Sequence, residues 1–75
     1  MPERIPLSRI RGEDIATAQR SLPECQQSSP DTVTADVEAQ YVGRVRISFT
    51  KMRSNHHRMR RWFWAAEIAE RIEHA

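Results

Sequence analysis

The chain has 75 residues, of which 39% are hydrophobic and 29% are charged, and its formal net charge is +2. A chain of this length builds one small domain with a thin core and has no material for a large substrate cavity. The longest apolar run, Trp62 to Ala66, is too short to span a membrane. Cys25 is the only cysteine, which excludes a disulfide scaffold.

The first twenty residues show no targeting pattern. They lack an apolar stretch and contain Glu3, Glu13 and Asp14, which argues against a secretory signal or an organelle transit peptide. A lone cysteine is compatible with a reducing compartment. We therefore expect a cytoplasmic protein.

All four prolines lie in residues 1–31, so the composition divides the chain into this N-terminal segment and linker and a second part, residues 32–75. Within the first part, residues 12–22 are predicted to form a short helix that Pro23 ends. A helix of this length is marginal without a surface to pack on. We expect residues 1–31 to be weakly ordered and part-helical at most.

A strict alternation of apolar and polar side chains starts at Thr32, with the apolar residues at odd positions. This period of two predicts strands over residues 32–41 and 45–51. A three-residue loop, Val42 to Arg44, would keep odd positions opposite odd ones and place Tyr41 opposite Val45. The alternative is a helix over residues 32–42 that ends at Gly43.

Residues 54–74 are predicted to form a C-terminal helix. Ser54 or Asn55 can cap its start, and an apolar arc that includes Trp64 and Ile68 runs along one face. Two strands alone do not make a stable sheet, but a helix packed on one face stabilises them. The predicted fold class is α+β, a small β-hairpin packed on a C-terminal helix (ββα), with the option of a homodimer.

The basic residues are clustered in the second half of the chain. Residues 1–40 carry four basic against seven acidic side chains, whereas residues 41–75 carry eight against three. Residues 44–61 contain seven basic side chains and no acid. Such clustering indicates a polyanionic partner, of which nucleic acid is the commonest.

Aromatic side chains border this basic segment, and Phe63 lies off the apolar arc of the predicted helix. An exposed aromatic beside arginines can stack on a nucleic-acid base, and a helix N-terminus favours phosphate. The alternative interpretation is a solvated basic face with the tryptophans in the core. The candidate nucleic-acid contacts are Arg44, Arg46, Lys51, Arg53, His56, His57, Arg58, Arg60 and Arg61.

Catalytic and metal-binding patterns are not apparent in the sequence. Cys25 has no histidine nearby in the sequence, and the adjacent His56 and His57 do not have zinc-ligand spacing. Gly12 and Gly43 are the only glycines, so no glycine-rich phosphate loop exists. We expect no enzymatic activity, no cofactor and no metal site.

No known family is recognised in the sequence. The pattern lacks the two helices of a ribbon-helix-helix or helix-turn-helix protein and the three strands of a double-stranded-RNA domain. The favoured function is therefore a small basic nucleic-acid-binding or regulatory accessory protein that contacts phosphates, DNA or RNA. The alternative is a protein–protein interaction module or inhibitor that docks on an acidic partner surface. A membrane-surface role is disfavoured because acids follow the basic residues.

Overall fold

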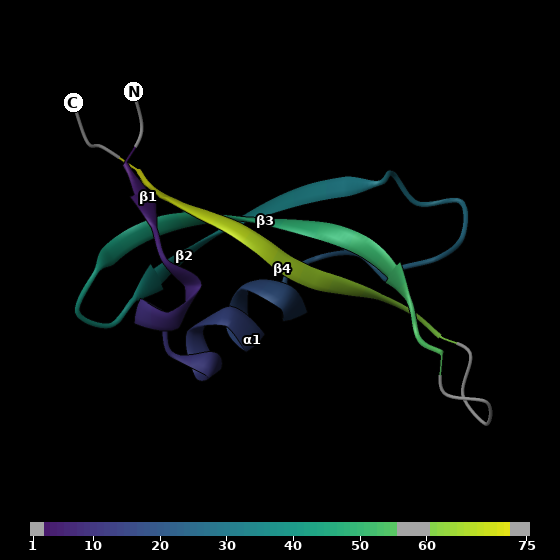
Figure 1. The fold of residues 1–75 in the computed structure, drawn as a ribbon, viewed down its shortest axis with the longest axis horizontal. Helices are drawn as coiled ribbons and strands as arrows, with labels where there is room; N and C mark the ends of the chain where they lie inside the picture. Colours follow the sequence, from purple (N-terminus) through teal and green to yellow (C-terminus); the bar gives the residue numbers. More distant parts are fainter. Residues whose placement is uncertain (1–2, 56–60, 73–75) are drawn as a thin grey trace.

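A four-stranded antiparallel sheet is the framework of the protein, and its strands lie in the order β1-β4-β3-β2 (Figure 1). The computed structural model describes residues 3–55 and 61–72. The longest dimension of the molecule, 44 Å, runs along β3 and β4. In chain order the elements are β1 (Arg4–Ile5), a 3-10 helix η1 (Leu7–Arg9), α1 (Gly12–Arg20), β2 (Thr32–Ala39), β3 (Gly43–Arg53) and β4 (Trp62–Arg71).

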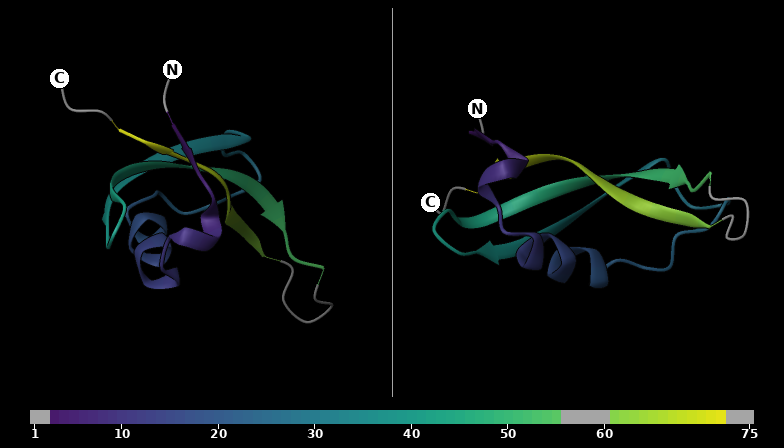
Figure 2. Two further views of the ribbon diagram at one scale, coloured as in Figure 1. Left: turned by 60° about the vertical axis from the view of Figure 1, so that its left-hand side comes forward. Right: turned by 60° about the horizontal axis from the view of Figure 1, so that its bottom comes forward.

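The core lies between the sheet and the two short helices, which cover one of its faces (Figure 2). Side-chain alternation along β3 turns Val45, Ile47 and Phe49 toward this face, where all three are fully buried. Their even-numbered neighbours lie on the opposite face, which no part of the described chain covers. The remaining buried side chains are Ile5, Ile10, Ala18, Ala35, Ala39, Trp64 and Ala69.

The predicted hairpin is present as β2 and β3, but its register differs from the predicted one. The loop has three residues, as expected, yet it comprises residues 40–42, so Val45 pairs with Val37 and not with Tyr41. Positive φ angles at Tyr41 (75°) and Gly43 (86°) reverse the chain. Apolar odd positions face one another in either register, so the alternation alone does not select between them.

The predicted C-terminal helix over residues 54–74 is wrong, and so is the ββα fold class. The structure describes residues 54–55 and 61–72 of this segment, and the ten-residue strand β4 lies where the helix was predicted. The ladder slips by one residue, because Ser48 pairs with Ile68 whereas Phe49 pairs with Ala66. This β-bulge leaves Glu67 as the extra residue and reverses the side-chain alternation along β4. A strand whose alternation reverses midway has apolar residues at mixed spacings, which mimic the period of a helix.

The N-terminal segment takes the place that the C-terminal helix was expected to fill. The predicted short helix is confirmed as α1, and Ala18 from its buried face packs in the core. Ile5 and Ile10 are also buried, so this segment is part of the core, and the expectation that it is weakly ordered is wrong. Trp64 ties the connection after α1 to the sheet, because its Nε1 donates a 2.9 Å hydrogen bond to the carbonyl of Pro23.

The β3–β4 hairpin extends beyond the other strands at one end of the sheet (Figures 1 and 2). The last β2 pair joins Thr32 to Thr50, and one further backbone hydrogen bond joins Lys51 N to Asp31 O at 2.8 Å. From Met52 onward β3 therefore has a partner only in β4. This end of the sheet is a two-stranded ribbon.

Candidate functional site

The structure divides the predicted basic residues between two ends and two faces of the sheet. Arg44 and Arg46 lie near the start of β3, whereas Lys51 and Arg53 lie at its end. At about 3.3 Å per residue, Arg44 and Lys51 are roughly 23 Å apart along the strand. Arg61 directly precedes β4. The other predicted contacts, His56, His57, Arg58 and Arg60, lie outside the described residues.

Arg46 is engaged with acidic neighbours on the uncovered face. Its Nε lies 2.9 Å and its Nη2 3.3 Å from the two carboxylate oxygens of Asp36. This pairing lowers the pKa of Asp36 and raises that of Arg46. The β4 residue opposite Arg46 is Glu70, and the β2 residue opposite Arg44 is Glu38. This end of the uncovered face therefore has mixed charges and offers little net attraction to a polyanion.

Lys51 has a structural role in holding the connection between α1 and β2. Its Nζ donates hydrogen bonds to the carbonyls of Gln27 (2.7 Å) and Ser29 (2.8 Å) and lies 3.9 Å from Asp31 Oδ1. Only 13% of its side chain is exposed. The same ammonium lies 5.2 Å from the centre of the Trp62 ring. Because its donors are already used, Lys51 is poorly placed to bind phosphate.

The ribbon end brings basic and aromatic side chains together. Arg53 pairs with Trp62 across the ladder, and its guanidinium carbon lies 5.9 Å from the centre of the indole ring. The ladder continues one step further, because Ser54 N donates a 2.8 Å hydrogen bond to Arg61 O. We call Met52, Arg53, Arg61, Trp62 and Phe63 the ribbon tip. Arg53 and Arg61 are both exposed.

The second face of the ribbon tip is apolar and exposed. Met52 pairs with Phe63, and their exposed fractions are 46% and 41%. The sequence pattern predicted Phe63 outside the apolar arc of a helix, and Phe63 does lie outside the core, but on a strand. The pattern did not identify Met52 or Trp62 as site residues. Both residues can be identified if the two segments are treated as paired antiparallel strands. Residues 51–53 then lie opposite residues 62–64, with Met52 opposite Phe63 and Arg53 opposite Trp62.

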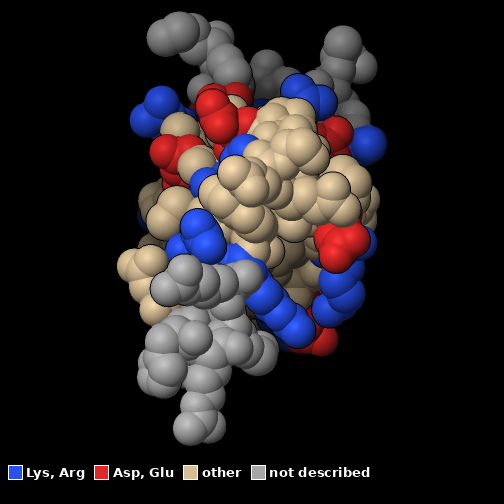
Figure 3. Space-filling view, turned by 90° about the vertical axis from the view of Figure 1, so that its right-hand side faces the viewer, with Lys and Arg blue, Asp and Glu red and all other residues tan. Residues whose placement is uncertain are grey.

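In the stretch of sequence around the ribbon tip, all the charged side chains are basic. No Asp or Glu occurs between Glu38 and Glu67, a span that includes all of β3 and the first half of β4. Figure 3 looks onto this end of the molecule and shows Lys and Arg side chains in both the upper and the lower part of the face, with acidic side chains in the upper part and beside the basic ones at the lower right. The ribbon tip therefore presents cations without adjoining carboxylates from its own strands.

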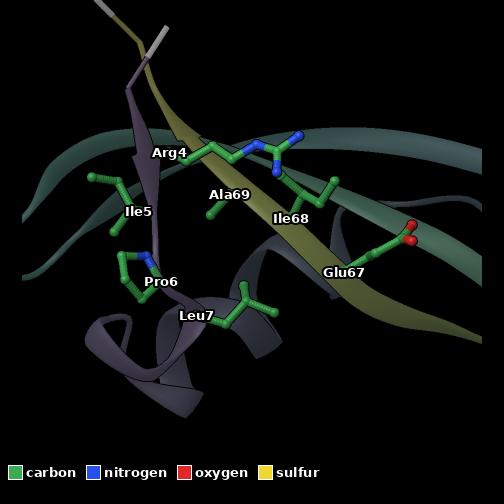
Figure 4. A pocket seen from close by; sticks show the side chains of 7 residues that line it. All are labelled: Arg4, Ile5, Pro6, Leu7, Glu67, Ile68 and Ala69. Carbon is green, nitrogen blue, oxygen red and sulfur yellow. The ribbon is translucent and has the colours of Figure 1, made fainter.

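Other sites in the described chain have fewer side chains that could bind a ligand or react with one. A hollow of about 310 Å³ opens between β1 and β4, and Figure 4 shows its lining side chains from β1, the start of η1 and the middle of β4. The only ionisable side chains that line it are Arg4 and Glu67. Cys25 is a half-buried free thiol, and burial raises its pKa, which makes it a weaker nucleophile at neutral pH.

Within residues 3–55 and 61–72, no group of three or more His, Cys, Asp or Glu side chains is arranged to hold a metal ion. No helix in the same residues is long and apolar enough to cross a membrane.

Comparison with known proteins assigns no relatives. The chain matches no protein-family model, and neither a curated protein nor a solved structure is significantly similar to it. The function is therefore argued from the geometry of the ribbon tip alone.

Proposed function

We propose that this protein binds nucleic acid through the ribbon tip, as a small accessory protein without catalytic activity acting in the cytoplasm. The observation that carries the proposal is that the exposed Arg53 and Arg61 lie together with the exposed Phe63 and the half-buried Trp62 on a two-stranded ribbon beyond the rest of the sheet. Arginine binds phosphate well because its planar guanidinium donates two parallel hydrogen bonds. Contacts of this kind are made mainly to the nucleic-acid backbone, so we expect weak sequence selectivity.

The proposal narrows the set of basic residues expected to contact phosphate. Arg53 and Arg61 remain candidates because they are exposed, have no carboxylate partner among the described contacts and lie at the ribbon tip, whereas Arg44 lies opposite Glu38 at the mixed-charge end. Arg46 is less suited because binding a phosphate would cost its pairing with Asp36. Lys51 contributes indirectly, since it contacts the Trp62 ring that Arg53 also contacts.

The test is fluorescence anisotropy of labelled single-stranded and duplex oligonucleotides titrated with the wild type and with two double variants. Arg53→Ala/Arg61→Ala removes the proposed contacts. Arg9→Ala/Arg20→Ala removes the same charge from η1 and α1, away from the ribbon. We expect the first variant to weaken binding at least tenfold and the second to change it less than twofold. Equal losses in both variants would show attraction to net charge only and contradict the proposal.

The alternative partner, an acidic protein surface, predicts a different result. A protein interface depends on shape as well as charge, so binding selects one partner and resists competition by heparin. If the wild type binds no oligonucleotide at low salt, the nucleic-acid proposal is wrong, and a protein partner should be sought by pull-down.

A further inference from the structure

Directly behind the ribbon tip, the strand pairs on the uncovered sheet face consist mainly of small side chains without charge. Behind the Met52–Phe63 pair, the next pair across β3 and β4 joins Thr50 to Ala65, and Thr32 of β2 pairs with Thr50. The pair after that joins Ser48 to Ile68. Over about 7 Å of strand, from Thr50 to Ser48, this part of the face carries mostly hydroxyl and aliphatic groups. Its charged neighbours are Glu67, whose carboxylate accepts a hydrogen bond from Thr50, and Arg4, which lies beside Ile68 (Figure 4).

The small neighbours leave the Phe63 ring accessible. Alternation along β4 places Ala65 on the same side of the sheet, two residues beyond Phe63, and a methyl group is too short to cover an aromatic ring. The ring is 41% exposed. It therefore borders a shallow shelf of Thr and Ala side chains that can accommodate a flat group.

Charges at the two ends of this shelf differ in sign. The carbonyl of Arg61 accepts the backbone hydrogen bond that extends the ladder, so Arg61 is in extended register with β4. Because Arg61 precedes Phe63 by two residues, the two side chains lie on the same face of the ribbon. On the other side of Phe63, next to the Thr50–Ala65 pair, the carboxylate of Glu67 accepts a hydrogen bond from Thr50 Oγ1, and Arg4 lines the same hollow as Glu67. Phosphate is attracted to the Arg61 end and repelled at the Glu67 end, so the shelf between them suits the uncharged part of a nucleotide.

We propose that the ribbon tip prefers single-stranded nucleic acid, with an unpaired base stacked on Phe63 and its phosphate at Arg61. This inference rests on the proposed function and deepens it by naming the ligand class. The bases of a duplex are stacked on one another and present only their edges in the grooves, whereas a single strand presents the flat faces of its bases. Met52, which pairs with Phe63, adds a polarisable side chain beside the ring.

The test compares Phe63→Leu with wild type on three labelled probes of equal length: oligo(dT), the same backbone lacking bases, and a mixed-sequence duplex. Leu keeps an apolar side chain but has no aromatic face. Tyr41→Leu is the matched control, because Tyr41 is an 89% exposed aromatic in the loop at the other end of the sheet. Circular dichroism and thermal unfolding of each variant verify that the fold is retained.

For the wild type we expect tighter binding to oligo(dT) than to the duplex or the abasic strand. Phe63→Leu should weaken oligo(dT) binding roughly 5- to 150-fold, the usual contribution of one stacked base. It should leave the affinity for the abasic strand and the duplex within twofold. Tyr41→Leu should bind all three probes as the wild type does.

The outcomes separate the two proposals. If the wild type binds all three probes equally and Phe63→Leu changes nothing, base stacking is wrong while phosphate binding stands. If the wild type binds none of the probes, nucleic-acid binding itself is wrong. Loss on the abasic strand as large as that on oligo(dT) would show that Phe63 acts without contacting a base, and would also overturn the inference.

Discussion

Arg53 and Trp62 face each other at the last pair of the β3–β4 ladder, with the guanidinium carbon 5.9 Å from the centre of the indole ring. Lys51, two residues earlier on β3, lies 5.2 Å from the same ring. One tryptophan thus contacts two cations at the point where the sheet narrows to two strands. The contact with the ring restrains the Arg53 side chain and leaves its positive charge in place, whereas a carboxylate partner would neutralise that charge.

The first prediction concerns this pair. Contacts between a cation and an aromatic ring at exposed sites contribute about 0.5–1 kcal/mol. A double-mutant cycle of Arg53→Ala and Trp62→Leu, followed by urea unfolding, should give a coupling energy of that size. Additive losses in the two single variants would show that the contact adds nothing to stability.

The second prediction concerns the anchor of the segment after α1. Trp64 is 4% exposed, and its Nε1 donates to the Pro23 carbonyl. Trp64→Phe retains an aromatic ring but removes the donor and some volume, so the free energy of unfolding should fall by about 1–3 kcal/mol. Phe63→Leu, one residue earlier but largely outside the core, should cost less than about 0.5 kcal/mol in the same urea titration. Equal costs would contradict the burial pattern of β4.

The fold could be predicted from the sequence only where the patterns were regular. Alternation from Thr32 to Thr50 identified both strands of the β2–β3 hairpin, and the acidic first turn and Pro23 identified α1. The alternation in β4 reverses at Glu67, where the bulge inserts one residue, and Ala and Glu favour helices. The helix preference of these residues and the apparent helical spacing of the apolar residues therefore both predicted a helix where the chain forms a strand. The pairing with β3 overrides both, because it buries Trp64 and Ala69 in the core.

The third prediction addresses the turn between β2 and β3, where Tyr41 of the loop and Gly43, the first residue of β3, both have positive φ angles. Gly43→Ala has free space for the added methyl group, so its cost comes from the backbone alone and should be about 1 kcal/mol. Tyr41→Gly should leave stability unchanged or raise it by up to about 1 kcal/mol, because it relieves the same backbone penalty and loses little packing. Thermal unfolding of both variants checks these opposite signs. A stabilising Gly43→Ala would be incompatible with the loop described.

The fourth prediction concerns pH. The hydrogen bonds from Arg46 hold the pKa of Asp36 below its ordinary value. A carboxyl whose pKa is lower in the folded protein stabilises the fold above its unfolded pKa, and this contribution disappears as pH falls through the folded pKa. Asp36→Asn should therefore lower stability at pH 7 by about 0.2–1 kcal/mol, the usual range for a surface pair. In acid titrations of urea unfolding, the difference from wild type should shrink below the ordinary pKa of Asp and vanish once Asp36 is protonated in the folded protein. A difference that persists there would assign the effect to something other than this charge.

The candidate site was less predictable than the fold, because its residues are brought together by strand pairing. The cluster of positive charge in residues 44–61 is a property of the sequence, but its division between two faces depends on the register of β3. Arg46 lies beside Asp36 only because residues 40–42 form the loop. Trp62 and Met52 join the site through their partners across the ladder. The predicted phosphate site at a helix N-terminus is absent from residues 61–72, where the chain is extended.

The measurement that tests the central claim most directly is the salt dependence of oligo(dT) binding. For single strands, the logarithm of the binding constant falls against the logarithm of salt concentration with a slope of about −0.7 for each phosphate neutralised. The slope for Arg53→Ala/Arg61→Ala should therefore be about 1.4 shallower than for the wild type. Arg9→Ala/Arg20→Ala should keep the wild-type slope. Identical slopes for the wild type and Arg53→Ala/Arg61→Ala would contradict phosphate binding at the ribbon tip.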